Sequence, residues 1–200
     1  MRTAQLPTLL LLSLAAGSSC SNRLPSVTGT VATPPASCLP GERGYLRIGL
    51  RGAMERDLDW RGGQLQCEGG ARPEGRGLRV SFSSVAPGAG TTLRIVFGIA
   101  AQPGASRSAN LPTNITVIVE GGNRLYATQG DGKCQVESMV QQPLDAAAGQ
   151  HAYRIAARGY CVDPATTLDG VGRLYINRFD FAGVARFEEP ELRASATGSG

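Results

Sequence analysis

Apolar and polar residues alternate along much of the chain, and this alternation constrains the fold more than any other feature of the sequence. It is clearest in residues 45–51, 78–83, 93–99 and 115–120. In the third of these segments one face carries four large apolar side chains, those of Leu93, Ile95, Phe97 and Ile99. Successive side chains of a β-strand point to opposite faces of its sheet. The period of two residues therefore predicts strands with one face on a core and one towards water.

Turn-forming residues stand between these segments. Clusters of Gly, Pro and Asn occur at 62–63, 87–88, 103–104 and 121–123. A further cluster at 129–132 contains Asp-Gly, which supplies the positive φ that tight turns need, so residues 125–128 and 133–137 are predicted to form a hairpin. Additional strands are expected around residues 65–67, 153–161 and 173–187.

Helical patterns are almost absent. Residues 53–60 and 144–148 are each expected to form at most a turn or two of helix, because no stretch carries the apolar stripe of an amphipathic helix. The predicted fold class is all-β, an antiparallel β-sandwich of eight or nine short strands held by disulfides. An open-ended barrel is the alternative.

The last predicted strand changes parity along its length. Its large apolar residues fall into two sets at odd and even positions: Tyr175, Phe179 and Phe181, and Leu174 and Ile176. A regular strand would send one set into solvent. A β-bulge near Asn177 and Arg178 is therefore predicted, since one extra residue would turn all of them towards the core.

The first of the five cysteines, Cys20, lies at the end of a short export-type segment. Arg2 precedes an apolar run at residues 9–16, which is too short to span a bilayer, and small residues follow at 17–19. A cysteine at this point resembles the lipobox of bacterial lipoproteins, in which the cysteine is lipidated and becomes the N-terminus. Gly17 departs from the branched apolar residue usual in that motif. Ordinary cleavage after Gly17 is therefore the alternative.

The remaining cysteines, Cys38, Cys67, Cys134 and Cys161, form an even set, as expected in an oxidising compartment. Three pairings are open to them. We favour Cys38–Cys67 and Cys134–Cys161, because each bond closes a moderate loop between neighbouring segments.

Composition divides the chain into four parts. Residues 1–19 are the predicted signal peptide, and residues 20–37, rich in Ser, Thr and Pro, are the lipidated cysteine and a flexible tether. Residues 38–187 are expected to form the β-sandwich domain, since a chain of this length can bury a sizeable core. Residues 188–200 are expected to be a disordered tail.

The motifs of common enzymes are missing. His151 is the only histidine, no G-x-S-x-G elbow is present, and no cysteine or histidine spacing fits a metal site. We therefore expect no catalytic residue, no cofactor and no metal. The net charge of +4 comes from arginines that are scattered along the chain, which argues against nucleic-acid binding.

Two short segments are candidates for ligand binding. Trp60 follows Asp59 in a charged stretch and could stack on a sugar ring, while Arg178 and Asp180 alternate with phenylalanines and would face outwards together. Simpler interpretations are a tryptophan that caps the edge of the core and a surface ion pair of small stabilising effect.

Several late segments, residues 132–136, 153–155, 159–161 and 178–183, resemble the C-terminal half of small exported bacterial β-sandwich lipoproteins. The mycobacterial 19-kDa lipoprotein antigen is distantly of this type. The resemblance covers about a third of the chain and implies no catalytic residue, because most such proteins have no assigned activity.

Together these features predict a lipid-anchored envelope protein, on the outer membrane in a Gram-negative host because Ser21 follows the cysteine. It is expected to be a binding or structural module with an envelope glycan or protein as its partner. A hydrolase of cell-envelope glycans, with paired carboxylates such as Asp57 and Asp59, is the alternative.

Replacement of Cys20 by Ser tests the anchor. In a host that processes lipoproteins, the native chain should enter the detergent phase and carry an N-terminal acyl mass, whereas Cys20→Ser should be released in soluble form. Intact-mass analysis checks this. A mature native chain that begins at Ser18 with an unmodified thiol at Cys20 would refute lipidation.

Overall fold

The computed structural model describes residues 38–188, apart from 40, 42, 74–75 and 85–91, and these residues contain eleven strands and no α-helix. Cys20, the tether and all of the predicted C-terminal tail except Glu188 therefore lie outside the described residues. None of the described segments is a helix of the length and hydropathy needed to cross a bilayer. The strands are β1 (Tyr45–Gly52), β2 (Arg56–Arg61), β3 (Leu65–Ala71), β4 (Leu78–Ser84), β5 (Thr92–Ile99), β6 (Arg107–Glu120), β7 (Arg124–Ala127), β8 (Cys134–Leu144), β9 (Gln150–Cys161), β10 (Ala165–Thr166) and β11 (Arg173–Glu188).

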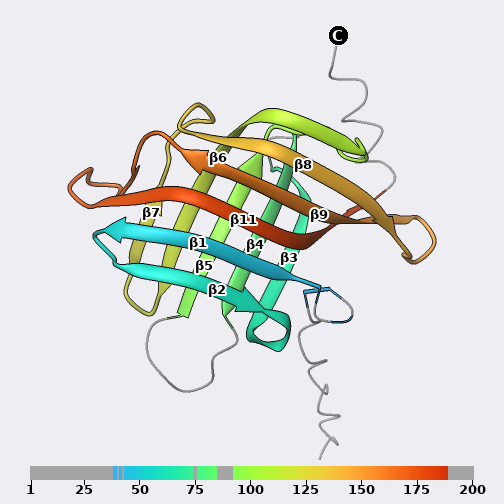
Figure 1. The fold of residues 1–200 in the computed structure, drawn as a ribbon, viewed down its shortest axis with the longest axis horizontal. Helices are drawn as coiled ribbons and strands as arrows, with labels where there is room; N and C mark the ends of the chain where they lie inside the picture. Colours follow the sequence, from blue (N-terminus) through green and yellow to red (C-terminus); the bar gives the residue numbers. More distant parts are fainter. Residues whose placement is uncertain (1–37, 40, 42, 74–75, 85–91, 189–200) are drawn as a thin grey trace, which may run out of the picture. The chain divides into compact units, whose positions relative to one another are not determined.

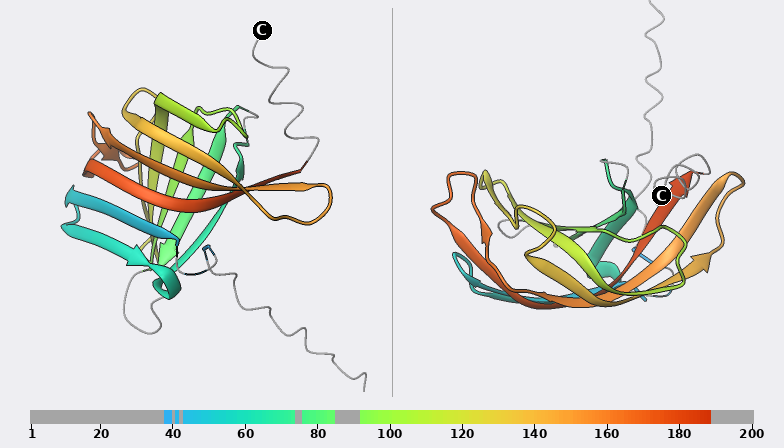
Figure 2. Two further views of the ribbon diagram at one scale, coloured as in Figure 1. Left: turned by 45° about the vertical axis from the view of Figure 1, so that its right-hand side comes forward. Right: turned by 90° about the horizontal axis from the view of Figure 1, so that it is seen from above.

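All the strand pairs are antiparallel, and they make two layers that share two long strands. One layer has the order β2-β1-β11-β9-β8, and β8 pairs with the first half of β6. The other layer runs from β3 through β4 and β5 to the second half of β6, then to β7 and β10, which pairs with the start of β11. The strands of the first layer cross over those of the second (Figure 1; Figure 2). The all-β, antiparallel sandwich predicted from the alternation is confirmed.

The layers are joined by an aromatic core. Phe82 on β4 and Phe97 on β5 face Phe179 and Phe181 on β11, with ring centroids 4.6 Å apart for Phe97 and Phe181 and 5.1 Å apart for Phe82 and Phe181. All four rings are buried. Each such aromatic contact adds about 0.5–1.5 kcal/mol to the free energy gained from burial alone. The core-facing side chains of β4 and β5 thus pack against those of β11.

The predicted bulge in β11 is present. Ile48 of β1 pairs with Phe179 and Leu50 pairs with Ile176, so two residues of β11, Asn177 and Arg178, oppose the single residue Gly49. Both sets of apolar side chains are buried as a result, except for Tyr175, which is 44% exposed. The expectation that the bulge would bury every large apolar residue of this strand was wrong for Tyr175 alone.

Three local predictions were wrong. Residues 144–148 form no helical turn, since Leu144 is the last residue of β8 and no helix follows it among the described residues. Residues 56–61 form strand β2 and not a helical turn, because Leu58 and Trp60 alternate with charged residues and pack against the core. The segments at 125–128 and 133–137 do not pair with each other. Strand β7 pairs with β6 and β10, whereas β8 pairs with β6 and β9, so the Asp-Gly turn carries the chain from one layer to the other. The extra short strands bring the number above the predicted eight or nine.

Both favoured disulfides are formed, Cys38–Cys67 and Cys134–Cys161, and they close loops with sequence separations of 29 and 27. The first fixes the start of the described domain to β3. The second joins directly opposed residues of β8 and β9. Loops of this length are expected to contribute about 3–4 kcal/mol each in the chain-entropy model.

Replacement of Gly159 on β9 tests how closely the first layer packs around Phe179. A Cβ atom at this position would lie 2.6 Å from Cζ of Phe179 and would also contact the backbone of Gln135 and Val136. Gly159→Ala is expected to lower the free energy of unfolding by about 1–3 kcal/mol, the usual cost of overpacking a core. Gly132→Ala, where a Cβ would have no neighbour within 4 Å, is the matched control. Equal stability of the two variants in denaturant unfolding would contradict this packing.

Candidate functional site

A row of charged side chains crosses the outward face of the first layer. The cross-strand register aligns Ser138 on β8, Arg158 on β9, Asp180 on β11, Arg47 on β1 and Asp59 on β2. Arg158, Asp180, Arg47 and Asp59 each lie between core-facing neighbours of their own strand, so they point away from the core. Ser138 lies on the same side because it directly opposes Arg158. Directly opposed side chains on one face of a sheet are close enough to interact. The row therefore alternates cation and anion across four adjacent strands, and it ends on a hydroxyl.

Ion pairs connect the members of this row. Arg47 lies between two carboxylates, with Nη1 at 3.6 Å from Oδ2 of Asp180 and Nε at 3.5 Å from Oδ1 of Asp59. Arg158 donates a hydrogen bond from Nε to Oγ of Ser138 at 3.1 Å. The side chains of Arg47, Asp59 and Asp180 are 41–51% exposed, so water and salt reach all three charges.

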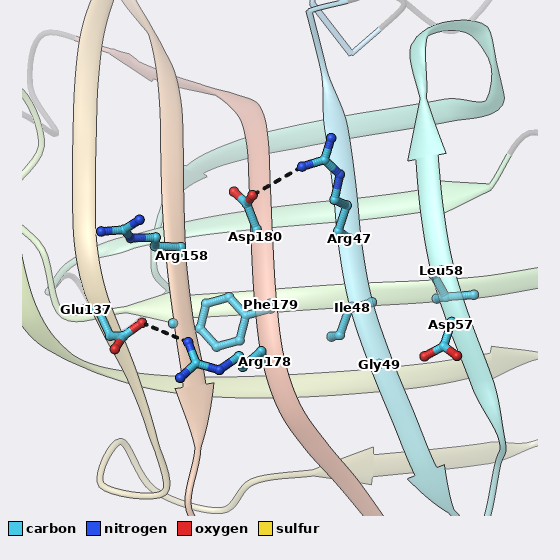
Figure 3. A pocket seen from close by; sticks show the side chains of 11 residues that line it. Arg47, Ile48, Gly49, Asp57, Leu58, Glu137, Arg158, Arg178, Phe179 and Asp180 are labelled. Carbon is cyan, nitrogen blue, oxygen red and sulfur yellow. Dashed lines mark ion pairs between the residues drawn. The ribbon is translucent and has the colours of Figure 1, made fainter.

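Below this row the face is hollowed into an open depression of about 370 Å³. Three guanidinium groups line it, those of Arg47, Arg158 and Arg178, together with three carboxylates, those of Asp57, Glu137 and Asp180 (Figure 3). Gly49 contributes to the floor and has no side chain to fill the space above it. The depression is therefore polar at its walls and open to solvent.

Two β-bulges build the depression. One is the bulge of β11 opposite Gly49, and the other is in β8, where Glu137 is the extra residue between Val136 and Ser138. The bulges lie on either side of β9, and Arg178 from the first reaches Glu137 of the second, with Nη1 and Oε2 3.8 Å apart (Figure 3). Bulges redirect side chains and occur often beside functional sites.

Asp180 is held by a second contact besides Arg47. The hydroxyl of Tyr45 donates a hydrogen bond to Oδ1 of Asp180 at 2.8 Å. Burial, and then this hydrogen bond to a carboxylate, raise the pKa of Tyr45 above its usual value, so the phenol stays protonated and continues to donate. The guanidinium carbon of Arg47 lies 5.1 Å from the centroid of the Tyr45 ring, a cation–π distance. Tyr45 therefore orients both charges of the central pair.

Asp59 is held in its charged form at the edge of the row. Arg61 donates two hydrogen bonds to its carboxylate, from Nε at 2.8 Å and from Nη2 at 2.7 Å. These hydrogen bonds lower the pKa of Asp59 below its ordinary value, and the charges of Arg61 and Arg47 act in the same direction. The bidentate pair fixes the orientation of this carboxylate.

The four residues suggested by the sequence separate into two groups. Asp59, Arg178 and Asp180 lie on the outward face, and Asp180 and Arg178 line the depression. Arg178 and Asp180 do face outwards together, and each pairs with a residue of another strand. Trp60 points to the opposite side of β2 and packs against the core.

The sequence did not predict several residues of the site, among them Arg47, Arg158 and Glu137. Arg47 and Arg158 stand at polar positions of predicted strands, but only the pairing of β1, β11 and β9 places them beside Asp180. Glu137 faces the depression because of its bulge, for which the local sequence offers no signal.

Within the described ranges, no group of three or more His, Cys, Asp or Glu side chains is arranged to hold a metal ion. Comparisons of this chain with protein-family models, with curated proteins and with solved structures find no match. The resemblance to small exported lipoproteins remains a prediction.

The electrostatics of the row can be tested at Asp59. Carbon-detected NMR titration should give this carboxyl group a pKa below that of an ordinary aspartate, because Arg61 and Arg47 stabilise the charged form. Arg61→Gln should raise this pKa more than Arg47→Gln does, since Arg61 donates the two hydrogen bonds. Any stability that Asp59 contributes is present at neutral pH and is lost as the pH falls through its depressed folded-state pKa. An unshifted pKa in the native chain would contradict the arrangement.

Proposed function

We propose that this protein is a non-catalytic binding module of the bacterial cell envelope, tethered to a membrane through lipidated Cys20. Its binding face is the outward surface of β8, β9, β11, β1 and β2. The observation that carries this proposal is the row of alternating guanidinium and carboxylate groups, in register across adjacent strands and bordering an open depression.

Stability alone does not account for so many charges on one face. Exposed ion pairs contribute only about 0–1 kcal/mol each, because water screens them and ordering long side chains costs entropy. A fixed pattern of alternating charge, in contrast, gives strong selectivity for a partner with the complementary pattern, since a shifted register places like charges together. The orientation of Asp180 by Tyr45, and of Asp59 by Arg61, supports a pattern that is set before the partner arrives.

A protein partner fits this face better than a glycan. Sugar rings are usually bound by stacking on exposed aromatic side chains. Tyr45 is engaged by Asp180 and Arg47, and Trp60 lies on the other side of its strand. The exposed aromatic side chain of Tyr175 on β11 pairs with Arg51 near the end of β1 and does not line the depression. The contacts that the row and the depression offer are charged ones, which suit a polypeptide surface carrying both acidic and basic side chains.

Features outside this face support the proposed location in the cell envelope. Two disulfides, one between β8 and β9 and one between Cys38 and β3, favour an oxidising environment. Cys20 is the one cysteine left after these pairs, and it stands where the segment of residues 9–19 would be cleaved.

The alternative, hydrolysis of envelope glycans, rests on the three carboxylates of the depression. Such an enzyme needs one carboxyl group kept protonated, usually by burial in an apolar pocket. Here Asp180 and Glu137 are 41% and 38% exposed, and each faces a guanidinium group, as does Asp57, which is 2.7 Å from Arg51. These exposed carboxylates lack the apolar burial that acid catalysis needs, which supports binding over hydrolysis.

The test uses the mature chain with Cys20→Ser as bait in detergent-solubilised envelope from its own host type. We expect the native face to retain a discrete protein whose capture weakens with added salt. Arg158→Glu and Arg47→Glu should reduce that capture at least tenfold, because each replaces an attractive contact by a repulsive one. Arg107→Glu, an exposed arginine at the start of β6, is the matched control.

Equal capture by all three variants would refute the proposed face. Incubation of the same chain with purified peptidoglycan tests the alternative. Release of soluble fragments by the native chain, lost in Glu137→Gln or Asp180→Asn, would establish the hydrolase and overturn the binding module.

A further inference from the structure

A second concavity lies on the other side of β2, between the described residues of the two layers. Strand β2 is an edge strand of its layer, and its core-facing side lies opposite the ends of β4, β5 and β6. The resulting cleft has a volume of about 290 Å³. It opens on the core-facing side of β2, whereas the depression opens on the outward side, and Leu58 of β2 borders both.

Apolar side chains from both layers form the walls of this cleft. Met54, Leu58 and Trp60 come from the β2 side, and all three are only partly buried. Leu93 at the start of β5 and Val119 near the end of β6 come from the other layer. The indole of Trp60 is therefore a wall of a cleft and not a filler of the closed core.

The charged groups among the described residues of the cleft are all of one sign. Arg56, at the start of β2, and Arg124, at the start of β7, line it, and the described lining residues include no carboxylate. In the part of the chain that the structure describes, neither guanidinium forms an ion pair with an acidic side chain. The hydroxyls of Ser84 and Thr92 are the other polar side-chain groups in the lining. The depression differs, because its three arginines are matched by three carboxylates.

We infer that this cleft binds a small amphiphilic anion, namely a single-chain fatty carboxylate. The apolar walls suit a hydrocarbon chain, and a guanidinium group pairs with a carboxylate through two parallel hydrogen bonds. The volume of about 290 Å³ lies just below the range of about 300–1,000 Å³ that is typical of small-molecule pockets, which favours one hydrocarbon chain over a two-chain lipid. The selectivity is set by Arg56 and Arg124, and the contact with the chain is made by Trp60.

This site does not depend on the protein-binding face proposed above. It uses the opposite side of β2 and a different set of arginines, so either proposal can fail while the other holds. A protein that is itself anchored among lipids would meet single-chain carboxylates in its own membrane.

Trp60 is the only tryptophan in the chain and makes the cleft directly observable. The experiment titrates the full mature chain, carrying Cys20→Ser, with dodecanoate below its critical micelle concentration and follows tryptophan emission. We expect a saturable shift of the emission to shorter wavelength, because the hydrocarbon chain displaces water from the indole. Dodecanol and dodecyltrimethylammonium, with the same chain and no negative charge, should bind at least about tenfold more weakly.

Variants distinguish the contribution of the carboxylate head group to affinity from that of the hydrocarbon chain. The double variant Arg56→Gln/Arg124→Gln should weaken dodecanoate binding at least about tenfold and remove its advantage over dodecanol. Arg107→Gln, at the far end of β6 from Val119, should leave the affinity unchanged, and far-UV circular dichroism confirms that each variant is folded. Absence of a saturable change in emission would overturn the inference. Equal affinities for dodecanoate and dodecanol, or an affinity unaffected by loss of both arginines, would overturn it as well.

Discussion

The structure depends most on the change of parity in the middle of β11. This strand belongs to both layers, so its first half must turn one set of side chains towards the core and its second half the other set. The bulge at Asn177 and Arg178 resolves this conflict, because it adds one residue against Gly49 and reverses the alternation. Burial of Phe179 and Phe181 then supplies the rings that join the layers, at about 1.5–3 kcal/mol for each fully buried side chain.

The same bulge decides what the outward face presents. With Phe179 and Phe181 inside, Asp180 must point outwards, where the register of β1 and β9 places it between Arg47 and Arg158. The charged row is thus a geometric consequence of how the core is filled. The bulge in β8 adds Glu137 to the same surface. A strand that were regular throughout could not combine this core with this face.

The sequence allowed much of the fold to be predicted, because alternation is a local signal that a strand carries in itself. It also predicted the bulge, since Leu174 and Ile176 could share a core with Phe179 only if the parity changed. Which strands pair with each other could not be predicted in the same way. The Asp-Gly turn before β8 suggested a hairpin, but the partners of β7 and β8 are chosen by burial against distant strands. The same holds for the site. Outward positions such as Asp180 could be predicted from the alternation within one strand. Their neighbours on adjacent strands could not, because the register between strands depends on contacts that are distant in the sequence.

Deletion of Asn177 tests the central role of the bulge most directly. The shortened β11 can keep Leu174 and Ile176 inside or Phe179 and Phe181 inside, but not both. Denaturant unfolding should then show the loss of about 3–6 kcal/mol, equivalent to exposing two large apolar side chains, or no cooperative transition at all. A deletion variant that unfolds cooperatively with the stability of the native chain would contradict the account.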